Sequence, residues 1–195
     1  MAWRATAALL MLATAGCASP PTQFYTLTAA GAPATPAASW DRAVSVGPVA
    51  VPAAVDRPEI VVTVGPNQLW LDEFNRWAAP LQSTLARVVA QNLVAQLGTA
   101  RVTAAPQTLG LEADYRVAIE VQGFTSAPGE AATLDALWRV SRVRDGQPLT
   151  GRTTVREPIA EAGYGALAAA HSRALARLSR DIAAAVQSLD GAAGK

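Results

Sequence analysis

The sequence predicts a single α+β domain in which a mostly antiparallel sheet is covered by two main amphipathic helices. Residues 114–124 alternate between apolar and polar side chains, which is typical of a strand with one buried face. Residues 80–97 and 164–189 instead repeat apolar side chains at helical spacing. No internal repeat is visible, and we expect the domain to occupy residues 24–190.

Four strands are expected in the first half of the chain, at residues 24–27, 43–51, 59–64 and 68–72. Pro48 interrupts the second of them and indicates an edge strand or a bulge, because proline donates no ladder hydrogen bond. The Gly65-Pro66-Asn67 turn predicts that the two strands beside it pair as a hairpin.

The helix at residues 80–97 begins with a proline, which suits an early helical position, and Gly98 is a natural stop. Further strands are expected at residues 101–104, 114–124, 131–144 and 148–156, the last two joined by a turn at Asp145-Gly146. The final helix carries one apolar stripe and is expected to lie on the sheet. We expect the tail to fray from Asp190, with residues 191–195 flexible.

The N-terminus has the order of a secretory signal peptide over residues 1–16: a positive charge at Arg4, a short apolar run and then small residues. The run is shorter than the ~20 residues that a membrane-spanning helix needs. Ala15-Gly16-Cys17 resembles a bacterial lipobox, although Thr14 stands where Leu is preferred. The alternative is an ordinary secreted protein with a chance cysteine.

Cys17 is the only cysteine in the 195-residue chain, so no intramolecular disulfide is possible. Lipidation at Cys17 accounts for a thiol that would otherwise stand unpaired in an oxidising envelope, and several acyl chains suffice for stable attachment. Residues 17–23 would then be the lipidated N-terminus and a short tether. Without Arg4 the chain has 15 basic and 15 acidic residues, which gives no basic patch for nucleic acid.

The inventory of reactive residues excludes several kinds of site. One histidine and one cysteine cannot form a His/Cys zinc site, and no other metal or cofactor is expected. His171 could serve a serine triad, but it falls on the apolar stripe of the last helix, which favours a core or edge histidine. Gly163-Tyr164-Gly165 opens that helix like a nucleotide-binding loop, yet no βαβ unit follows, which favours a turn. The acidic residues give no reason to choose an acid/base pair among Asp72, Glu73, Glu157 and Glu161.

Three aromatic residues, Trp70, Phe74 and Trp77, lie close together between the predicted hairpin and the first helix. Their clustering favours core packing. The alternative is an exposed apolar surface for a partner protein or lipid.

Several segments of the chain follow one another in the order of a known lipoprotein family. They are the lipobox, Phe24-Tyr25-Thr26-Leu27, Val46-Gly47-Pro48-Val49, Asp56-Arg57-Pro58-Glu59, Phe74-Asn75-Arg76-Trp77 with Pro80-Leu81, and the last helix. Their order resembles the ABC-type transport auxiliary lipoprotein family, the PqiC-like lipoproteins. Ala79 departs from the family pattern, in which an acidic residue precedes Pro-Leu.

The resemblance implies a non-catalytic lipoprotein subunit of an MCE/ABC-type intermembrane lipid transport system. Its implied partners are an MCE-domain protein, on whose periplasmic end it would dock, inner-membrane permease and ATPase components, phospholipid, and further copies of itself in a homo-oligomer. The family signature positions include Asp56, Arg57 and the Trp77 to Leu81 segment, which we expect to shape the domain first and to contact partners second. Ala18 after the cysteine favours the outer membrane. The alternatives are a structural or assembly envelope lipoprotein and an envelope esterase.

Overall fold

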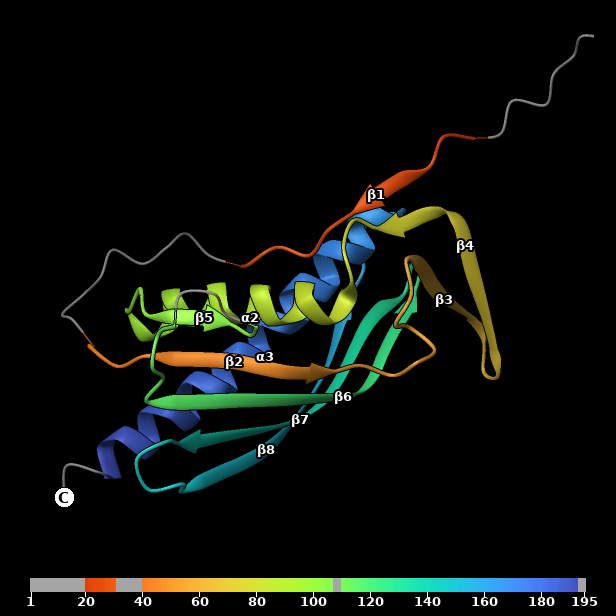
Figure 1. Ribbon diagram of the computed structural model, residues 1–195. Coiled ribbons are helices and arrows are strands. Elements are labelled where there is room, and N and C mark those ends of the chain that lie inside the picture. The colour runs from red at the N-terminus through yellow and green to blue at the C-terminus, as the bar shows by residue number, and fades with distance from the viewer. Residues whose placement is uncertain (1–19, 31–39, 107–109, 193–195) are drawn as a thin grey trace, which may run out of the picture.

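The computed structural model describes residues 20–30, 40–106 and 110–192 (Figure 1). The predicted signal peptide, Cys17 and most of the Ala/Pro-rich segment 29–39 lie outside these ranges. The described chain forms two β-sheets and two helices, an α+β fold as predicted. No helix in these ranges is both long and apolar enough to cross a membrane.

A five-stranded sheet forms the body of the domain, and its strand order is β5-β2-β6-β7-β8. These strands are β2 (Val44–Ala50), β5 (Val102–Ala104), β6 (Tyr115–Ala127), β7 (Ala131–Arg142) and β8 (Pro148–Pro158). The last three form an antiparallel meander, whereas β2 runs parallel to both of its neighbours. The sheet is therefore mixed, with its antiparallel part in the C-terminal half of the chain.

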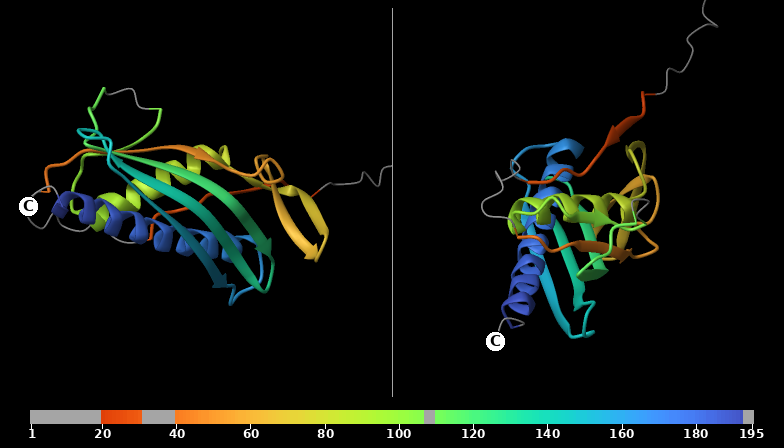
Figure 2. Two further views of the ribbon diagram at one scale, coloured as in Figure 1. Left: turned by 90° about the horizontal axis from the view of Figure 1, so that it is seen from below. Right: turned by 60° about the vertical axis from the view of Figure 1, so that its left-hand side comes forward.

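Two helices cover one face of this sheet (Figure 2). Helix α2 (Leu81–Leu97) packs on β2 and β5, and α3 (Tyr164–Ala192) packs on β7 and β8. Pro80 occupies the position before the first turn of α2, and Gly98 ends that helix with φ of 67°, a conformation that favours glycine. Both predicted helices are confirmed.

A smaller sheet stands at one end of the domain, with the strand order β1-β4-β3. Its strands are β1 (Gln23–Tyr25), β3 (Glu59–Gly65) and β4 (Gln68–Trp77). The predicted hairpin of β3 and β4 is present, and it extends away from the helices (Figures 1 and 2). Strand β1 pairs in parallel with the end of β4, so the N-terminal segment enters the fold at this end.

The structure also refines two local predictions. Pro48 lies in an interior strand and not at an edge, and the ladder between β2 and β6 shifts register between Val46 and Val49, which is the predicted bulge. At the start of the tail, the Asp190 carboxylate accepts hydrogen bonds from Trp40 Nε1 at 2.9 Å and from the Tyr115 hydroxyl at 2.8 Å. Helix α3 ends at Ala192, two residues beyond Asp190.

Candidate functional site

The three aromatic residues of the predicted cluster lie on one strand, β4, but in different environments. Trp77 is only 6% exposed and meets the rings of Phe124 and His171 edge-on, with centroid distances of 6.3 and 6.4 Å. Trp70, seven positions earlier, is 60% exposed, and Phe74 is 37% exposed. Core packing is therefore the right interpretation for Trp77 and the wrong one for Trp70, because β4 runs out beyond the elements that cover its C-terminal end.

The structure brings two of the segments that carry the sequence resemblance together around one cavity. This cavity has a volume of about 420 Å³ and is lined by Asp56, Arg57, Pro58 and the segment from Trp77 to Leu81. The Trp77 amide donates to the Pro58 carbonyl oxygen at 2.7 Å and thereby joins its two walls. Pro58 and Trp77 are 19 positions apart in sequence, and the pairing of β3 with β4 makes the two segments neighbours.

Polar contacts set the positions of Asp56 and Arg57. Gln82 Nε2 donates to the Asp56 carboxylate at 3.0 Å, which links the loop to the first turn of α2. Arg57 Nε donates to Glu59 at 3.2 Å, and Arg76 donates to the other oxygen of the same carboxylate at 2.6 Å. These contacts hold the pKa of Glu59 below its usual value, chiefly through the hydrogen bond with its own backbone and then through the two arginines. Ala79 offers Arg57 no carboxylate, and Arg57 pairs with Glu59.

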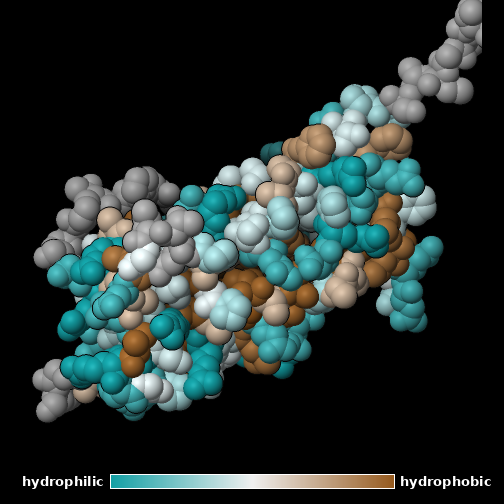
Figure 3. All heavy atoms as spheres, viewed as in Figure 1, coloured by the Kyte–Doolittle hydropathy of each residue, from teal (hydrophilic) through white to brown (hydrophobic). Residues whose placement is uncertain are grey.

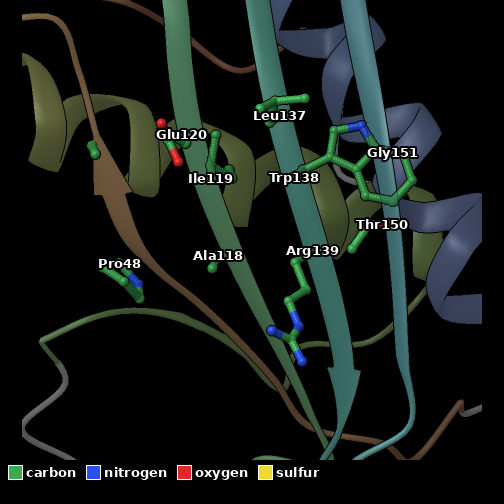
Figure 4. Close-up of a pocket in the computed structure, with 10 residues that line it drawn as sticks. Pro48, Ala118, Ile119, Glu120, Leu137, Trp138, Arg139, Thr150 and Gly151 are labelled. Atoms are coloured by element: carbon green, nitrogen blue, oxygen red, sulfur yellow. The ribbon is translucent and has the colours of Figure 1, made fainter.

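A second hollow lies on the face of the five-stranded sheet that the helices leave open (Figure 4). It has a volume of about 520 Å³ and draws its lining from β2, β6, β7 and β8, including Pro48, Ala118, Leu137, Arg139 and Thr150. On the opposite, helix-covered face, Gly151 leaves room for the Trp138 ring, since a Cβ at this position would overlap three of its ring atoms. Trp138 Nε1 there donates to Thr153, whose hydroxyl donates to Asp181 of α3. The hollow is largely apolar, with Glu120 and Arg139 as its charged members. No sequence pattern pointed to it, because its lining residues lie on strands distant in sequence.

His171 is fully buried, as its place on the apolar stripe predicts. Its ring stacks on Phe124 at 3.8 Å, and its Nε2 shares a 2.8 Å hydrogen bond with the Ser126 hydroxyl. Burial lowers the pKa of His171 to about 3, so the ring is neutral at physiological pH. Nδ1 has no hydrogen-bond partner among the residues that the structure describes. A serine triad needs a third group on that nitrogen and a substrate that can reach the serine, and Ser126 is also buried.

The acidic residues considered as an acid/base pair have separate structural roles. Asp72 accepts from the Tyr164 hydroxyl at 2.6 Å and from the amides of Phe74 and Asn75. Glu157 is buried and pairs with Arg173 at 3.1 Å and with Arg177 at 2.6 Å, which fastens α3 to β8. No group of three His, Cys, Asp or Glu side chains that could hold a metal ion occurs in the part of the chain that the structure describes.

The comparison with known families decides what kind of protein this is. The profile of the family described as "ABC-type transport auxiliary lipoprotein component" matches residues 25–183, which include both walls of the Asp56–Leu81 cavity. The chain belongs to this family. The predicted resemblance is thus confirmed, and the family is one of transport auxiliary lipoproteins, not of enzymes.

Solved structures support the fold of this auxiliary lipoprotein. A crystal structure of an uncharacterized protein matches with a TM-score of 0.70 at 22% identity, over 86% of this chain and 99% of the other. Protein XCC0632 from Xanthomonas campestris matches with a TM-score of 0.66 at 23% identity, over 83% of this chain and 93% of the other. At these identities the likeness shows the fold alone. A comparison with curated protein sequences finds no match.

Proposed function

We propose that this auxiliary lipoprotein is a non-catalytic subunit of an MCE/ABC-type intermembrane lipid transport system. Lipid on Cys17 would hold it at the outer membrane, facing the periplasm, where it would dock on the MCE component as a homo-oligomer. The observation that carries the proposal is the match of the transport auxiliary family to residues 25–183, a short distance after the lipobox-like sequence that ends at Cys17. The buried Ser126–His171 pair gives the alternative of an envelope esterase no accessible nucleophile.

The cavity between Asp56 and Leu81 is the proposed docking point for the MCE component. Its walls join the two signature segments, its charges are held in place by Gln82 and Glu59, and Trp77 behind it ties it to the core. A partner side chain that enters this cavity would meet an apolar floor beside one carboxylate and one guanidinium. Such a mixed pocket suits specific protein recognition.

Affinity purification of the lipidated protein from cross-linked membranes tests the docking role. We expect an MCE-domain protein to co-purify with the wild type and to be lost from the Asp56→Ala, Arg57→Ala double variant. The matched control is Asp41→Ala, Arg101→Ala, which removes an exposed ion pair of 2.9 Å that lines no part of this cavity. Recovery of the wild type without any MCE or permease component would contradict the proposal and favour a structural or assembly lipoprotein.

The anchor and its location are tested separately. Mass spectrometry of the mature chain should find acyl groups on Cys17, and density-gradient separation should place the protein in the outer-membrane fraction. A Cys17→Ala variant should lose membrane association. An unmodified Cys17 in the mature protein would contradict the proposed anchor.

A further inference from the structure

The hairpin of β3 and β4 carries an exposed apolar surface that neither the fold nor the proposed docking cavity uses. Together with β1, it presents six large hydrophobic side chains to solvent, and we call this set the hairpin surface: Phe24, Val64, Leu69, Trp70, Leu71 and Phe74. Hydrophobic residues gather over β4 at this end of the molecule (Figure 3). Concentrated exposure of this kind marks an interaction site more often than an accident of composition.

The segment that leads from Cys17 joins the fold beside this surface. Strand β1 pairs in parallel with the end of β4, with Gln23 opposite Asn75 and Tyr25 opposite Trp77. Gln23 is six positions after Cys17, so the intervening chain reaches at most ~20 Å. Phe24, the most exposed of the six side chains at 65%, lies on β1 itself. A lipid on Cys17 therefore enters the bilayer within a short distance of the hairpin surface.

The base of the hairpin is held firmly against the rest of the domain. The Tyr164 hydroxyl at the start of α3 donates to Asp72, and the Tyr25 hydroxyl donates to Asn75 Oδ1 at 2.9 Å. The rings of Tyr25 and Tyr164 lie 5.9 Å apart between these two contacts. The hairpin consequently keeps its direction and cannot easily fold its apolar side chains back onto the body.

The chemistry of the hairpin fits a lipid surface better than a protein groove. Residues 60–71 contain no charged side chain. Leu69 and Trp70 are adjacent on β4 and so point to opposite faces of the ribbon, and both are more than half exposed. A protein groove covers one face of a ribbon, whereas a fluid apolar phase covers both at once. Tryptophan also favours the membrane interface, where its apolar ring can be buried while its N–H stays in contact with polar groups.

We propose that the hairpin surface is a second membrane contact, seated in the interfacial layer of the same leaflet that holds the lipid of Cys17. This inference rests on the proposed lipid anchor. The contact is shallow, because a two-stranded ribbon leaves backbone groups unpaired along its edges, and these groups cannot enter the hydrocarbon core without large cost. It turns a single point of attachment into two and thereby restricts the orientation of the domain on the membrane.

A single introduced cysteine can report this contact, because acylation blocks the only native thiol. We would label Leu69→Cys with the environment-sensitive fluorophore NBD in the full-length lipidated protein. The protein is then reconstituted into phosphatidylethanolamine/phosphatidylglycerol vesicles with and without acyl-brominated phosphatidylcholine. The matched control is Val143→Cys. Val143 is 44% exposed, against 51% for Leu69, and it directly follows the last residue of β7.

The expected result is a blue-shifted emission at position 69 that brominated lipid quenches, with neither effect at position 143. A label at 69 that aqueous iodide quenches, in protein that still floats with the vesicles, would overturn the inference and leave the anchor intact. A label shielded from both iodide and bromine would also overturn it and would identify a protein cover. A disulfide between two Leu69→Cys chains would then identify a second copy as that cover. Absence of lipid on Cys17 by mass spectrometry would overturn the anchor and this inference together.

Discussion

The two ends of strand β4 carry the same residue type in opposite surroundings. Trp77 is enclosed by Phe124 and His171, whereas Trp70 projects from the hairpin with most of its surface in solvent. Both belong to regular ladder positions, since Trp77 pairs with Tyr25 and Trp70 with Val62. The two residues differ because other elements of the described chain pack over the C-terminal end of β4 and none of them covers Trp70. One strand can therefore contribute to the core at one end and present a surface for an external contact at the other.

The largest effect is expected at the enclosed end. Replacing Trp77 with Ala removes the ring that closes the core beside Phe124 and His171 and leaves a cavity, so the free energy of unfolding should fall by about 3–5 kcal/mol. Chemical denaturation followed by circular dichroism measures this loss. A change below about 1 kcal/mol would mean that Trp77 contributes no more than a surface residue.

The helix-covered face of the large sheet, at its β8 edge, gives an intermediate case. Gly151→Val should lower the free energy of unfolding by about 1–3 kcal/mol, because the new side chain must displace the Trp138 ring and its 3.0 Å hydrogen bond to Thr153. Gly165→Ala is the control, since nothing lies within 4 Å of its added Cβ. Equal stability of the two variants would show that the Trp138 ring can leave its place without loss.

The pH dependence of the free energy of unfolding tests the core around Trp77 and His171 without changing the size of any side chain there. The folded state keeps His171 neutral down to a pKa of about 3, while the unfolded chain takes up a proton near 6.5. The stability that the neutral ring contributes is thus present above the unfolded pKa and lost as the pH falls. From about pH 7 to about pH 5 the free energy of unfolding should drop by about 2 kcal/mol from this group.

A His171→Gln variant isolates that contribution, because every carboxylate is common to both proteins. The variant should show a shallower loss than the wild type when urea unfolding is compared at the two pH values. Parallel losses would mean that His171 titrates alike in the folded and unfolded chain.

The smallest effect on stability is expected at the exposed end. Trp70→Ala removes a side chain that is 60% exposed and should change the free energy of unfolding by no more than about 0.5 kcal/mol. The same denaturation assay measures it beside Trp77→Ala. A loss comparable to that of Trp77→Ala would remove the contrast between the two ends of β4.

The sequence predicts those parts of the fold that depend on local patterns. Pro80 and Gly98 mark the ends of α2 correctly, and the alternation in residues 114–124 places Val117 and Val121 on the buried face of β6. Pairing between distant segments leaves no such local trace. The parallel contacts of β2 with β5 and β6 are therefore not visible in the pattern of β2 itself.

In the candidate site, too, the sequence indicates single residues but not which distant residues meet in the folded chain. The resemblance points to Asp56, Arg57 and Trp77, but only the folded chain shows that they line one cavity. Apolar spacing predicts that His171 is buried, yet nothing in the spacing identifies Ser126 as its partner, 45 residues earlier. The exposure of Trp70 is equally hidden, because its neighbours Leu69 and Leu71 have the composition of a core strand.

The length of α3 sets the distance between the hairpin end of the domain and the opposite end, where α3 finishes. The helix has 29 residues and so extends ~43 Å, from Tyr164 beside the hairpin base to Ala192 beyond the Asp190 contacts. With the hairpin at the bilayer, as proposed, an upright α3 would act as a spacer that holds the opposite end of the domain that far from the membrane. A fluorescent protein fused after Lys195 would report from that height, and energy transfer to a dye in the membrane would measure how far the domain leans.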